Sequence, residues 1–249
     1  MLQRQDETDS LTSLTRRTRT DLLVVGATER ELEWSSSNEV RDLLGRSRLA
    51  VEFLVTGVGE VSAAFALGNY LSDFAPALIL SVGVGGAFPL SGLGPGGVAV
   101  ATSETDGDWG VESPGAILKE PLSVPRFISP EGEEVQGEFA VSIPHADIIA
   151  SLSEERYPTI KGPFLTTSTV TSTAESADAL FKAHGAICEN MEGAAVAHAA
   201  LISGASFAEV RGISNVVGPR DLASWKLDEA IGAAGWVATR FIEYLEESK

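Results

Sequence analysis

The sequence predicts an α/β fold with three layers, in which a central twisted, mostly parallel mixed sheet is flanked by helices. The 249 residues are 44% hydrophobic, which is enough to form one full core. From residue 21 onward, short apolar strands alternate with helical patterns, an order typical of parallel strands joined by right-handed crossovers. We therefore expect a single domain at residues 20–249, preceded by a polar, flexible N-terminal tail at residues 1–19.

In the N-terminal half, apolar strands that end near glycine alternate with helical patterns. Asp21 to Gly26 is a buried strand, followed at Ala27 to Glu33 by a turn into a helix whose acidic residues suit its N-terminus. Leu49 to Thr56 is the next strand, and Glu60 to Phe74 is a helix because its apolar residues recur at helical spacing. Ala77 to Val84 is the third strand.

The C-terminal half continues the alternation after one long irregular segment. Val98 to Glu104 is a strand, and the residues from Thr105 to Pro130 form a loop long enough to be functional or mobile. The remaining elements are bounded by proline, threonine or glycine. They are a helix at 144–155, an extended segment at 159–173, a helix at 176–184, a short strand before Met191, a helix ending at Ser203, a strand at 207–217 and a mostly helical segment at 221–247.

The composition excludes several classes of partner. The formal net charge is −17, which argues against nucleic acid or an anionic membrane as partner. The apolar run at residues 75–90 is broken by glycine and proline, so we expect no membrane-spanning helix. The single cysteine, Cys188, suits a reducing compartment, and the first 20 residues lack the apolar core of a signal peptide. We therefore expect a cytoplasmic protein.

The sequence does not suggest a metal site or a cofactor. His145, His184 and His198 are far apart in the chain, with no acid or cysteine at ligand spacing. His198 in particular is expected to be a core or interface residue. We therefore expect neither a metal nor a cofactor in the site.

Two glycine runs follow strands and resemble phosphate-binding loops. Gly57-Val58-Gly59 is an incomplete dinucleotide fingerprint, because Ser62 stands at the third glycine position and Glu60 would repel a pyrophosphate. Gly83-Val84-Gly85-Gly86 is not followed by a helix. Close packing between strand and turn is the alternative explanation for both runs. Glycine also allows a ligand to lie against the backbone, so both runs remain candidates for the wall of a cavity.

Polar side chains at strand ends are the candidates for chemistry. Glu192 lies between Met191 and an alanine-rich helix, where a carboxylate is poorly hydrated and needs a partner. Glu31 and Asn215 also lie near strand ends, and in a parallel sheet these ends face the same side. We therefore expect the three side chains to converge. The alternatives are that Glu189 and Glu192 only favour a helix N-terminus, that Glu31 is a solvated acid, and that Asn215 is a turn residue.

Four motifs in order resemble those of the nucleoside phosphorylase and nucleosidase superfamily. They are Gly26-Ala27-Thr28-Glu29-Arg30-Glu31, Thr56-Gly57-Val58-Gly59-Glu60-Val61-Ser62-Ala63-Ala64, Asn190-Met191-Glu192-Gly193-Ala194-Ala195 and Val210-Arg211-Gly212-Ile213-Ser214-Asn215. The resemblance extends from about Asp21 to the terminal helix. It implies a nucleoside substrate, no cofactor, and assembly as a homodimer or a larger homo-oligomer.

Within this superfamily the sequence is most similar to the futalosine hydrolase family of the alternative menaquinone pathway. The similarity rests on Met191-Glu192-Gly193-Ala194-Ala195 and on Ile213-Ser214-Asn215, followed by Val217-Gly218-Pro219-Arg220 and Trp225. The resemblance implies hydrolysis of futalosine with release of hypoxanthine. Adenine-releasing relatives carry aspartate at the place of Asn215, serine at that of Val84 and an aromatic residue near Val170. The alternatives are an adenine-releasing nucleosidase that acts on methylthioadenosine, S-adenosylhomocysteine or aminofutalosine, and a nucleoside-binding protein without catalysis.

The resemblance also implies a role for each candidate residue. Glu31 would activate the attacking water, Glu192 would hold the ribose hydroxyls, and Asn215 would select a 6-oxopurine because its amide cannot supply a proton. Arg220 and Lys226 are candidates for the carboxylate of the substrate tail, or else lie on a solvated helix start. No basic residue follows either glycine run, which favours hydrolysis over phosphorolysis. The expected substrate-binding residues are Val58, Val84, Gly85, Gly86, Val170, Thr171, Asn190, Met191, Arg220 and Trp225.

Overall fold

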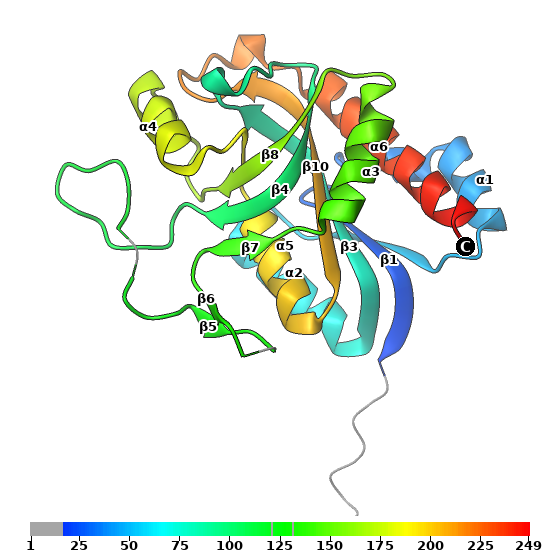
Figure 1. Ribbon diagram of the computed structural model, residues 1–249. Helices are drawn as coiled ribbons and strands as arrows, with labels where there is room; N and C mark the ends of the chain where they lie inside the picture. The colour runs from blue at the N-terminus through cyan, green and yellow to red at the C-terminus, as the bar shows by residue number, and fades with distance from the viewer. Residues whose placement is uncertain (1–16, 121, 131) are drawn as a thin grey trace, which may run out of the picture.

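The computed structural model describes residues 17–120, 122–130 and 132–249 (Figure 1). Residues 1–16 of the expected tail lie outside the described residues. Strand β1 (Thr18–Gly26) begins two residues before the expected start of the domain, so Thr18 and Arg19 belong to the sheet. They pair with Phe74 and Ala75 of the neighbouring strand.

One mixed sheet of eight strands forms the centre of the described part of the chain, in the order β10-β4-β8-β9-β3-β1-β2, with β7 paired to β4. Because β10 also pairs with β3, the strands from β3 through β9, β8 and β4 to β10 close into a ring. The remaining strands of the sheet are β2 (Val51–Val55), β3 (Phe74–Ala87), β4 (Val98–Asp106), β7 (Glu138–Ala140), β8 (Thr159–Thr166), β9 (Cys188–Asn190) and β10 (Ser206–Val216), and a separate hairpin joins β5 (Phe127–Ile128) to β6 (Glu134–Val135).

The strands run in two parallel groups of opposite direction. β1, β2, β3 and β10 are parallel to one another, and β4, β8 and β9 form the second group. Consequently β9 is antiparallel to β3, with Glu189 opposite Gly86 and Cys188 opposite Ala87. Because β9 has only three residues, Glu189 and Glu192 lie beside the carboxyl end of β3 although their strand runs the other way. The mixed sheet that the sequence predicts is confirmed.

Helices cover both faces of this sheet and complete three layers (Figure 1). Helices α2 and α5 pack against each other on one face, and α3 and α6 pack on the other, with α1 beside α6. The helices are α1 (Asn38–Arg46), α2 (Glu60–Asp73), α3 (Ile143–Glu154), α4 (Ala174–His184), α5 (Gly193–Ser203) and α6 (Leu227–Glu247), with short 3₁₀ turns at η1 (Glu33–Ser36), η2 (Pro89–Ser91) and η3 (Leu222–Ser224).

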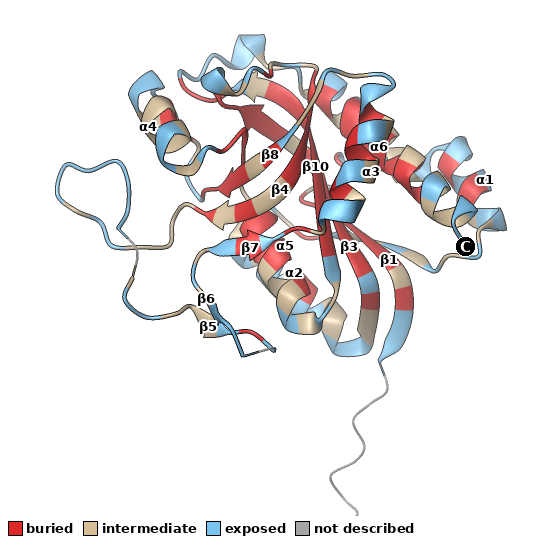
Figure 2. Ribbon diagram, viewed as in Figure 1, coloured by how far each residue is buried: buried red, intermediate tan, exposed pale blue. Residues whose placement is uncertain are grey.

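The core lies between the sheet and its helices, where Figure 2 shows the central strands buried along much of their length. Leu80 of β3 and Phe241 of α6 are fully buried, and each such side chain contributes about 1.5–3 kcal/mol by leaving water. Helix α5 is buried on nearly all sides and consists mostly of alanine, so it lies close to the strands. Close packing at α5 brings polar groups at its N-terminus near the sheet, where they become part of the site described below.

Two expected boundaries were wrong. Residues 29–32 form a turn instead of the start of a helix, because the Glu31 carboxylate accepts hydrogen bonds from the amide and hydroxyl of Thr28 and closes a tight loop. The 3₁₀ turn η1 follows at Glu33, and the first α-helix, α1, begins only at Asn38, where the Ser37 hydroxyl caps it. Strand β3 continues to Ala87, past the glycines that were expected to end it. Among the described residues, no helix is both long and apolar enough to cross a membrane.

Candidate active site

A cavity of about 350 Å³ opens at the carboxyl ends of β1, β3 and β10, beside β9. Its size suits a small ligand, and parallel strand ends are where α/β proteins bind ligands. Most of the predicted site residues line it: Glu31, Val58, Val84, Gly85, Gly86, Val170, Asn190, Met191, Glu192, Asn215 and Trp225. Residues that were not among the predicted site residues also line it: Ala27, Thr28, Arg30, Glu189, Ser214, Leu227 and Ile231.

Glu31 reaches the cavity from the turn after β1 and is only 7% exposed. One carboxylate oxygen, Oε2, accepts hydrogen bonds from the Thr28 amide at 3.0 Å and the Thr28 hydroxyl at 2.9 Å. The other, Oε1, accepts from the Val84 amide at 3.0 Å. Three donors hold the carboxylate in one orientation, so it is a positioned acceptor facing a cavity and not a solvated surface acid.

Glu192 is 6% exposed and lies at the N-terminus of α5. Its side chain does not cap that helix. The Asn190 side-chain oxygen instead accepts from the amides of Glu192 at 3.0 Å and Gly193 at 2.7 Å. The Glu192 carboxylate accepts from the Gly59 amide at 3.0 Å and lies 3.4 Å from Nη1 of Arg211. The partner expected for this carboxylate is therefore present, and the helix-start alternative does not account for it.

Arg211 is the main site residue that the sequence analysis missed. It is 2% exposed, and its Nε donates to Glu209 at 2.7 Å. Burial lowers the pKa of its guanidinium, but the carboxylates of Glu209, Glu192 and Glu31 outweigh this effect and raise the pKa above its ordinary value. The arginine is therefore a permanent positive charge behind the two acidic groups of the cavity. One sequence feature could have pointed to Arg211. It lies in an otherwise apolar strand, and a charge buried there needs partners.

The glycines of β3 give neighbouring side chains room to approach. A Cβ at Gly83 would lie 2.5 Å from Oε1 of Glu31 and 2.7 Å from Nη1 of Arg211. At Gly85 it would lie 2.4 Å from the Cys188 sulfur, and at Gly86 it would lie 3.1 Å from Nδ2 of Asn215. The packing explanation of this run therefore holds, and Gly85 and Gly86 also line the cavity.

In each glycine run, one backbone amide already donates to a carboxylate of the cavity. The Val84 amide donates to Glu31, and the Gly59 amide, at the N-terminus of α2, donates to Glu192. Gly59 has a φ of 88°, a left-handed conformation that strongly favours glycine. This turn therefore presents its amide to a carboxylate of the protein itself.

Glu189 is a third buried carboxyl group on the cavity wall. Burial raises its pKa, although hydrogen bonds from the amide and hydroxyl of Thr171 oppose this rise. Thr171, a predicted substrate-binding residue, does not line the cavity and contacts Glu189 instead. Its neighbour Val170 does line the cavity. Thr171 is thus placed to hold a wall residue and not to touch a ligand.

The opposite wall is formed by the end of β10 and the segment after it. Oδ1 of Asn215 lies 2.8 Å from the Ser214 hydroxyl, and Nδ2 donates to the Val216 carbonyl at 3.2 Å. A second hydrogen on Nδ2 is left to point at a ligand. Trp225 lines the cavity, whereas the Arg220 guanidinium lies 5.8 Å from the centre of the Trp225 ring and outside the cavity wall.

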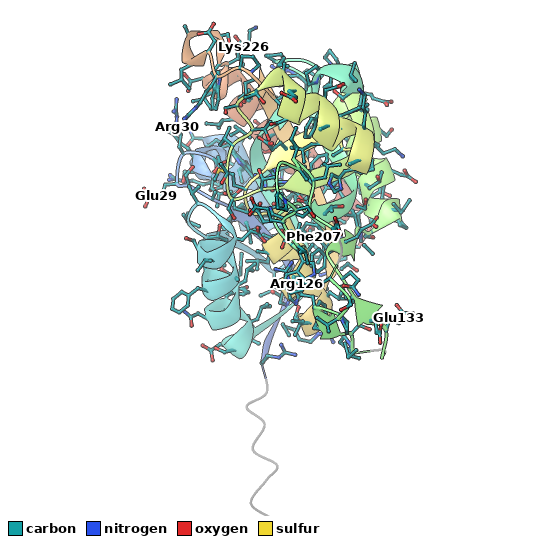
Figure 3. The ribbon with its side chains drawn as sticks, turned by 90° about the vertical axis from the view of Figure 1, so that its left-hand side faces the viewer. Glu29, Arg30, Arg126, Glu133, Phe207 and Lys226 are labelled. Atoms are coloured by element: carbon teal, nitrogen blue, oxygen red, sulfur yellow. The ribbon has the colours of Figure 1, made fainter. Side chains whose placement is uncertain are left out.

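The rim of the cavity carries a positive charge from an unexpected position. Among the described residues that line the cavity, Arg30 is the one with a cationic side chain, and it pairs with Asp228 at the start of α6. Lys226, an expected candidate for this role, pairs with Glu229. Figure 3 shows Arg30 and Lys226 toward the same edge of the molecule.

Within the described parts of the chain, no group of three or more histidine, cysteine or acidic side chains could hold a metal ion.

This site defines a class of enzyme: a hydrolase or transferase that holds a small ligand between positioned carboxylates at the strand ends of an α/β fold. The chain belongs to the phosphorylase superfamily, whose family model matches residues 44–248. It is 33% identical to a futalosine hydrolase of Streptomyces coelicolor over 80% of this chain and 81% of the relative. It is 32% identical to a futalosine hydrolase of Thermus thermophilus over 76% of this chain and 80% of the relative.

Solved structures share the fold. A 5′-methylthioadenosine/S-adenosylhomocysteine nucleosidase from Neisseria meningitidis, in complex with methylthio-immucillin-A, superposes with a TM-score of 0.73 at 19% identity, covering 90% of this chain and 99% of that one. A futalosine hydrolase of Helicobacter pylori gives a TM-score of 0.73 at 14% identity, covering 91% and 98%. These likenesses confirm the predicted nucleoside phosphorylase-like fold.

Proposed function

We propose that this chain hydrolyses the N-glycosidic bond of futalosine and releases hypoxanthine and dehypoxanthine futalosine, a step of menaquinone biosynthesis. The observation that carries the proposal is the shared cavity of Glu31, Glu192 and Asn215 in a chain about a third identical to futalosine hydrolases. The proposed site needs no cofactor, because the side chains that line it supply the acceptor, the sugar ligand and the base ligand.

Glu31 and Glu192 have different roles in the proposed mechanism. Cleavage of a nucleoside passes through an oxocarbenium-like sugar, which negative charge nearby stabilises. Glu192, fixed by the Gly59 amide and Arg211, would hold the ribose hydroxyls, with Met191 beside the sugar. Glu31, fixed by Thr28 and Val84, would accept the proton of the attacking water.

Asn215 would bind the leaving base. Its free Nδ2 hydrogen can donate to N7 or O6 of a 6-oxopurine, and this bond strengthens as negative charge develops on the departing ring. An aspartate at this position could donate its carboxylic proton to the leaving adenine. The amide of Asn215 has no such proton, so adenine is disfavoured as the leaving base. The proposed base is therefore hypoxanthine.

The proposed nucleophile is water and not phosphate. The Gly59 amide at the start of α2 is used by Glu192, and that helix begins with the acidic side chain of Glu60. A phosphate ion at this turn would meet the Glu192 carboxylate, whereas phosphate sites offer free amides and cations. This arrangement favours hydrolysis.

The proposed partner for the substrate tail is Arg30, because futalosine carries an aromatic carboxylate. In this proposal the carboxylate replaces Asp228 on the guanidinium, and the aromatic ring packs near Trp225. Arg220 would act indirectly, by supporting Trp225 through its contact with that ring.

Replacing Arg30 with glutamine is expected to raise the KM for futalosine about tenfold or more, because one charge-assisted hydrogen bond is lost. The KM for a purine nucleoside with an uncharged tail should stay the same. Steady-state kinetics on both substrates provides the measurement, and Arg41→Gln on exposed α1 is the matched control. An equal rise in KM for both substrates would remove Arg30 from tail recognition.

We propose that the chain assembles as a homodimer or larger oligomer in the cytoplasm. A second cavity of about 600 Å³ lies along α2 and α5, away from the proposed chemistry, and Val61, Phe65 and Ile202 nearby are exposed. Phe65 is 72% exposed, and contiguous apolar surface of this kind marks interaction sites. The molar mass in solution, measured by light scattering, would decide the oligomeric state.

The proposed function is tested by incubating the enzyme separately with futalosine, aminofutalosine and methylthioadenosine and identifying the released base. Rapid release of hypoxanthine from futalosine without added phosphate is the expected result. Adenine release from either other substrate at a higher kcat/KM would assign the chain to the adenine-releasing alternative. Binding of futalosine without any turnover would make it a binding protein.

A further inference from the structure

Two carboxyl groups that the proposed mechanism does not use lie behind the cavity, at the N-terminus of α5. Glu104 of β4 and Glu209 of β10 are both 0% exposed, and neither lines the cavity. A Cβ on Gly193 would lie 2.5 Å from Oε1 of Glu104 and 2.7 Å from Oε2 of Glu209. The two carboxyl groups therefore approach the same point from two strands, and only a glycine leaves room for both.

Each carboxyl group has one oxygen with partners and one without. Oε1 of Glu104 accepts from Nδ2 of Asn190 at 2.7 Å and from the Thr166 hydroxyl. Oε1 of Glu209 accepts from Nε of Arg211 at 2.7 Å. The Oε2 atom of each carboxyl group is buried and has no hydrogen-bond partner among the described residues. Two ionised carboxylates this close would repel each other and leave two costly unpartnered oxygens.

We propose that Glu104 and Glu209 share one proton, carried by Glu104, and that the pair positions Glu192 from behind. The proton belongs to Glu104 because Glu209 has a cationic partner in Arg211, whereas the donors to Glu104 are neutral. With the proton on Oε2 of Glu104, the pair carries one negative charge, which lies on the carboxylate that Arg211 contacts. This inference rests on the proposed role of Glu192 in turnover, but the shared proton itself does not.

The pair reaches Glu192 by two routes. Glu104 holds the Asn190 amide, and Oδ1 of that amide accepts from the backbone amide of Glu192 at 3.0 Å. Glu209 holds Arg211, whose Nη1 lies 3.4 Å from Oε2 of Glu192. One route fixes the backbone of Glu192 and the other fixes its carboxylate. Glu104 and Glu209 are therefore positioning residues, since neither touches the cavity.

The charges around the pair give it a defined dependence on pH. The ionisable groups that face it are Arg211, Glu192 and Cys188. Burial raises the pKa of Glu104 well above its usual range, and the charge of Glu209 raises it further. Burial also raises the pKa of Glu209, against the opposing effect of Arg211. The pKa of the Cys188 thiol is raised well above its usual range by burial, so this group stays neutral.

The sign of the stability effect follows from these directions. A carboxyl group whose pKa is raised by folding stabilises the folded state fully below its unfolded pKa, and this contribution is lost as the pH rises through its folded pKa. The contribution of the pair to the free energy of unfolding should therefore fall as the pH rises above 4.5, the ordinary pKa of a glutamate. Glu104→Gln, a permanently neutral isostere, should show a weaker fall.

Infrared spectroscopy of the full chain tests the shared proton directly. The wild type minus Glu104→Gln difference spectrum at pH 7 should contain the C=O band of a protonated carboxylic acid, shifted in D₂O. The matched control, Glu112→Gln in the exposed loop after β4, should give no such band. Absence of the band would overturn the proposal. Titration of the wild-type band needs no variant, so failure of a variant to fold does not prevent the test.

Kinetics tests the positioning role. Glu104→Gln should keep kcat within about threefold of the wild type, because its amide can reproduce the neutral acid. Glu209→Gln should lower kcat about a hundredfold with little change in KM, since Arg211 and Glu192 lose their alignment. Equal losses in both variants would overturn the assignment of the proton to Glu104. If no nucleoside is hydrolysed even by the wild type, the infrared and unfolding measurements still decide whether the proton is shared.

Discussion

Replacing Glu31 with glutamine is expected to lower kcat for futalosine about a thousandfold while leaving substrate affinity within about threefold. Glutamine has nearly the same shape but cannot accept a proton from water, and general-base catalysis contributes roughly 10²–10⁴ in rate. Single-turnover kinetics gives the chemical step, and calorimetric titration with futalosine gives the dissociation constant. Because both oxygens of Glu31 accept from backbone amides, the NH₂ group of glutamine must give up the hydrogen bond from either Thr28 or Val84, while its oxygen keeps the other.

The control for this experiment is Glu29→Gln, in the same turn, because the Glu29 side chain is exposed at the edge of the molecule (Figure 3) and does not line the cavity. It should behave as the wild type. A Glu31→Gln enzyme with wild-type kcat would show that another group accepts the proton. A loss of affinity equal to the loss of kcat would point to a collapsed site and not to missing base catalysis.

The second large effect concerns which purine base the enzyme releases. Asn215→Asp is expected to shift the ratio of kcat/KM for futalosine over aminofutalosine by about a thousandfold toward the adenine-containing substrate. A site built to hydrogen-bond one pattern of donors and acceptors rejects the other pattern by roughly this factor or more. An aspartate can accept from the exocyclic amine of adenine and, when protonated, donate to N7. Kinetics with each substrate, with the released base identified by chromatography, measures the shift.

The matched control is Asn38→Asp, the same substitution at the exposed start of α1. It should leave the substrate ratio unchanged. An unchanged ratio in Asn215→Asp would mean that the base is selected elsewhere on the wall, with Val84 and Val170 the nearest alternatives. A loss of activity on both substrates would show that the position needs an uncharged side chain for a reason other than base selection.

Local patterns in the sequence predicted most of the strands and helices. Leu22 to Val25 form a buried strand because they are a continuous apolar run, and α2 follows Gly59 as its helical spacing predicts. The turn expected at residues 27–33 is present, but it leads into a short 3₁₀ helix at Glu33 and not into an α-helix, because the Glu31 side chain bonds to its own turn. The expected end of β3 at Val84 failed because its glycines continue the strand.

The residues that line the cavity were predicted largely from motifs. The stated reason for their convergence, that the ends of parallel strands face the same side, was only partly right. Glu31 and Asn215 do lie at the ends of parallel strands. Glu192 follows a strand antiparallel to β3 and reaches the site because β9 is short. Strand direction, ring closure by β10 and the buried position of Arg211 depend on contacts between distant segments, and no local pattern encodes these.

The glycine run of β3 limits how this enzyme can diversify. At Gly83, Gly85 and Gly86 even a methyl group would meet a neighbouring atom at 3.1 Å or less. A side chain at any of these positions would therefore require the surrounding residues to rearrange. Val84 is the remaining position of the run, and its side chain is free to vary while its amide keeps Glu31 in place. New substrate preferences in this lineage should therefore arise on this strand by exchange of a single side chain.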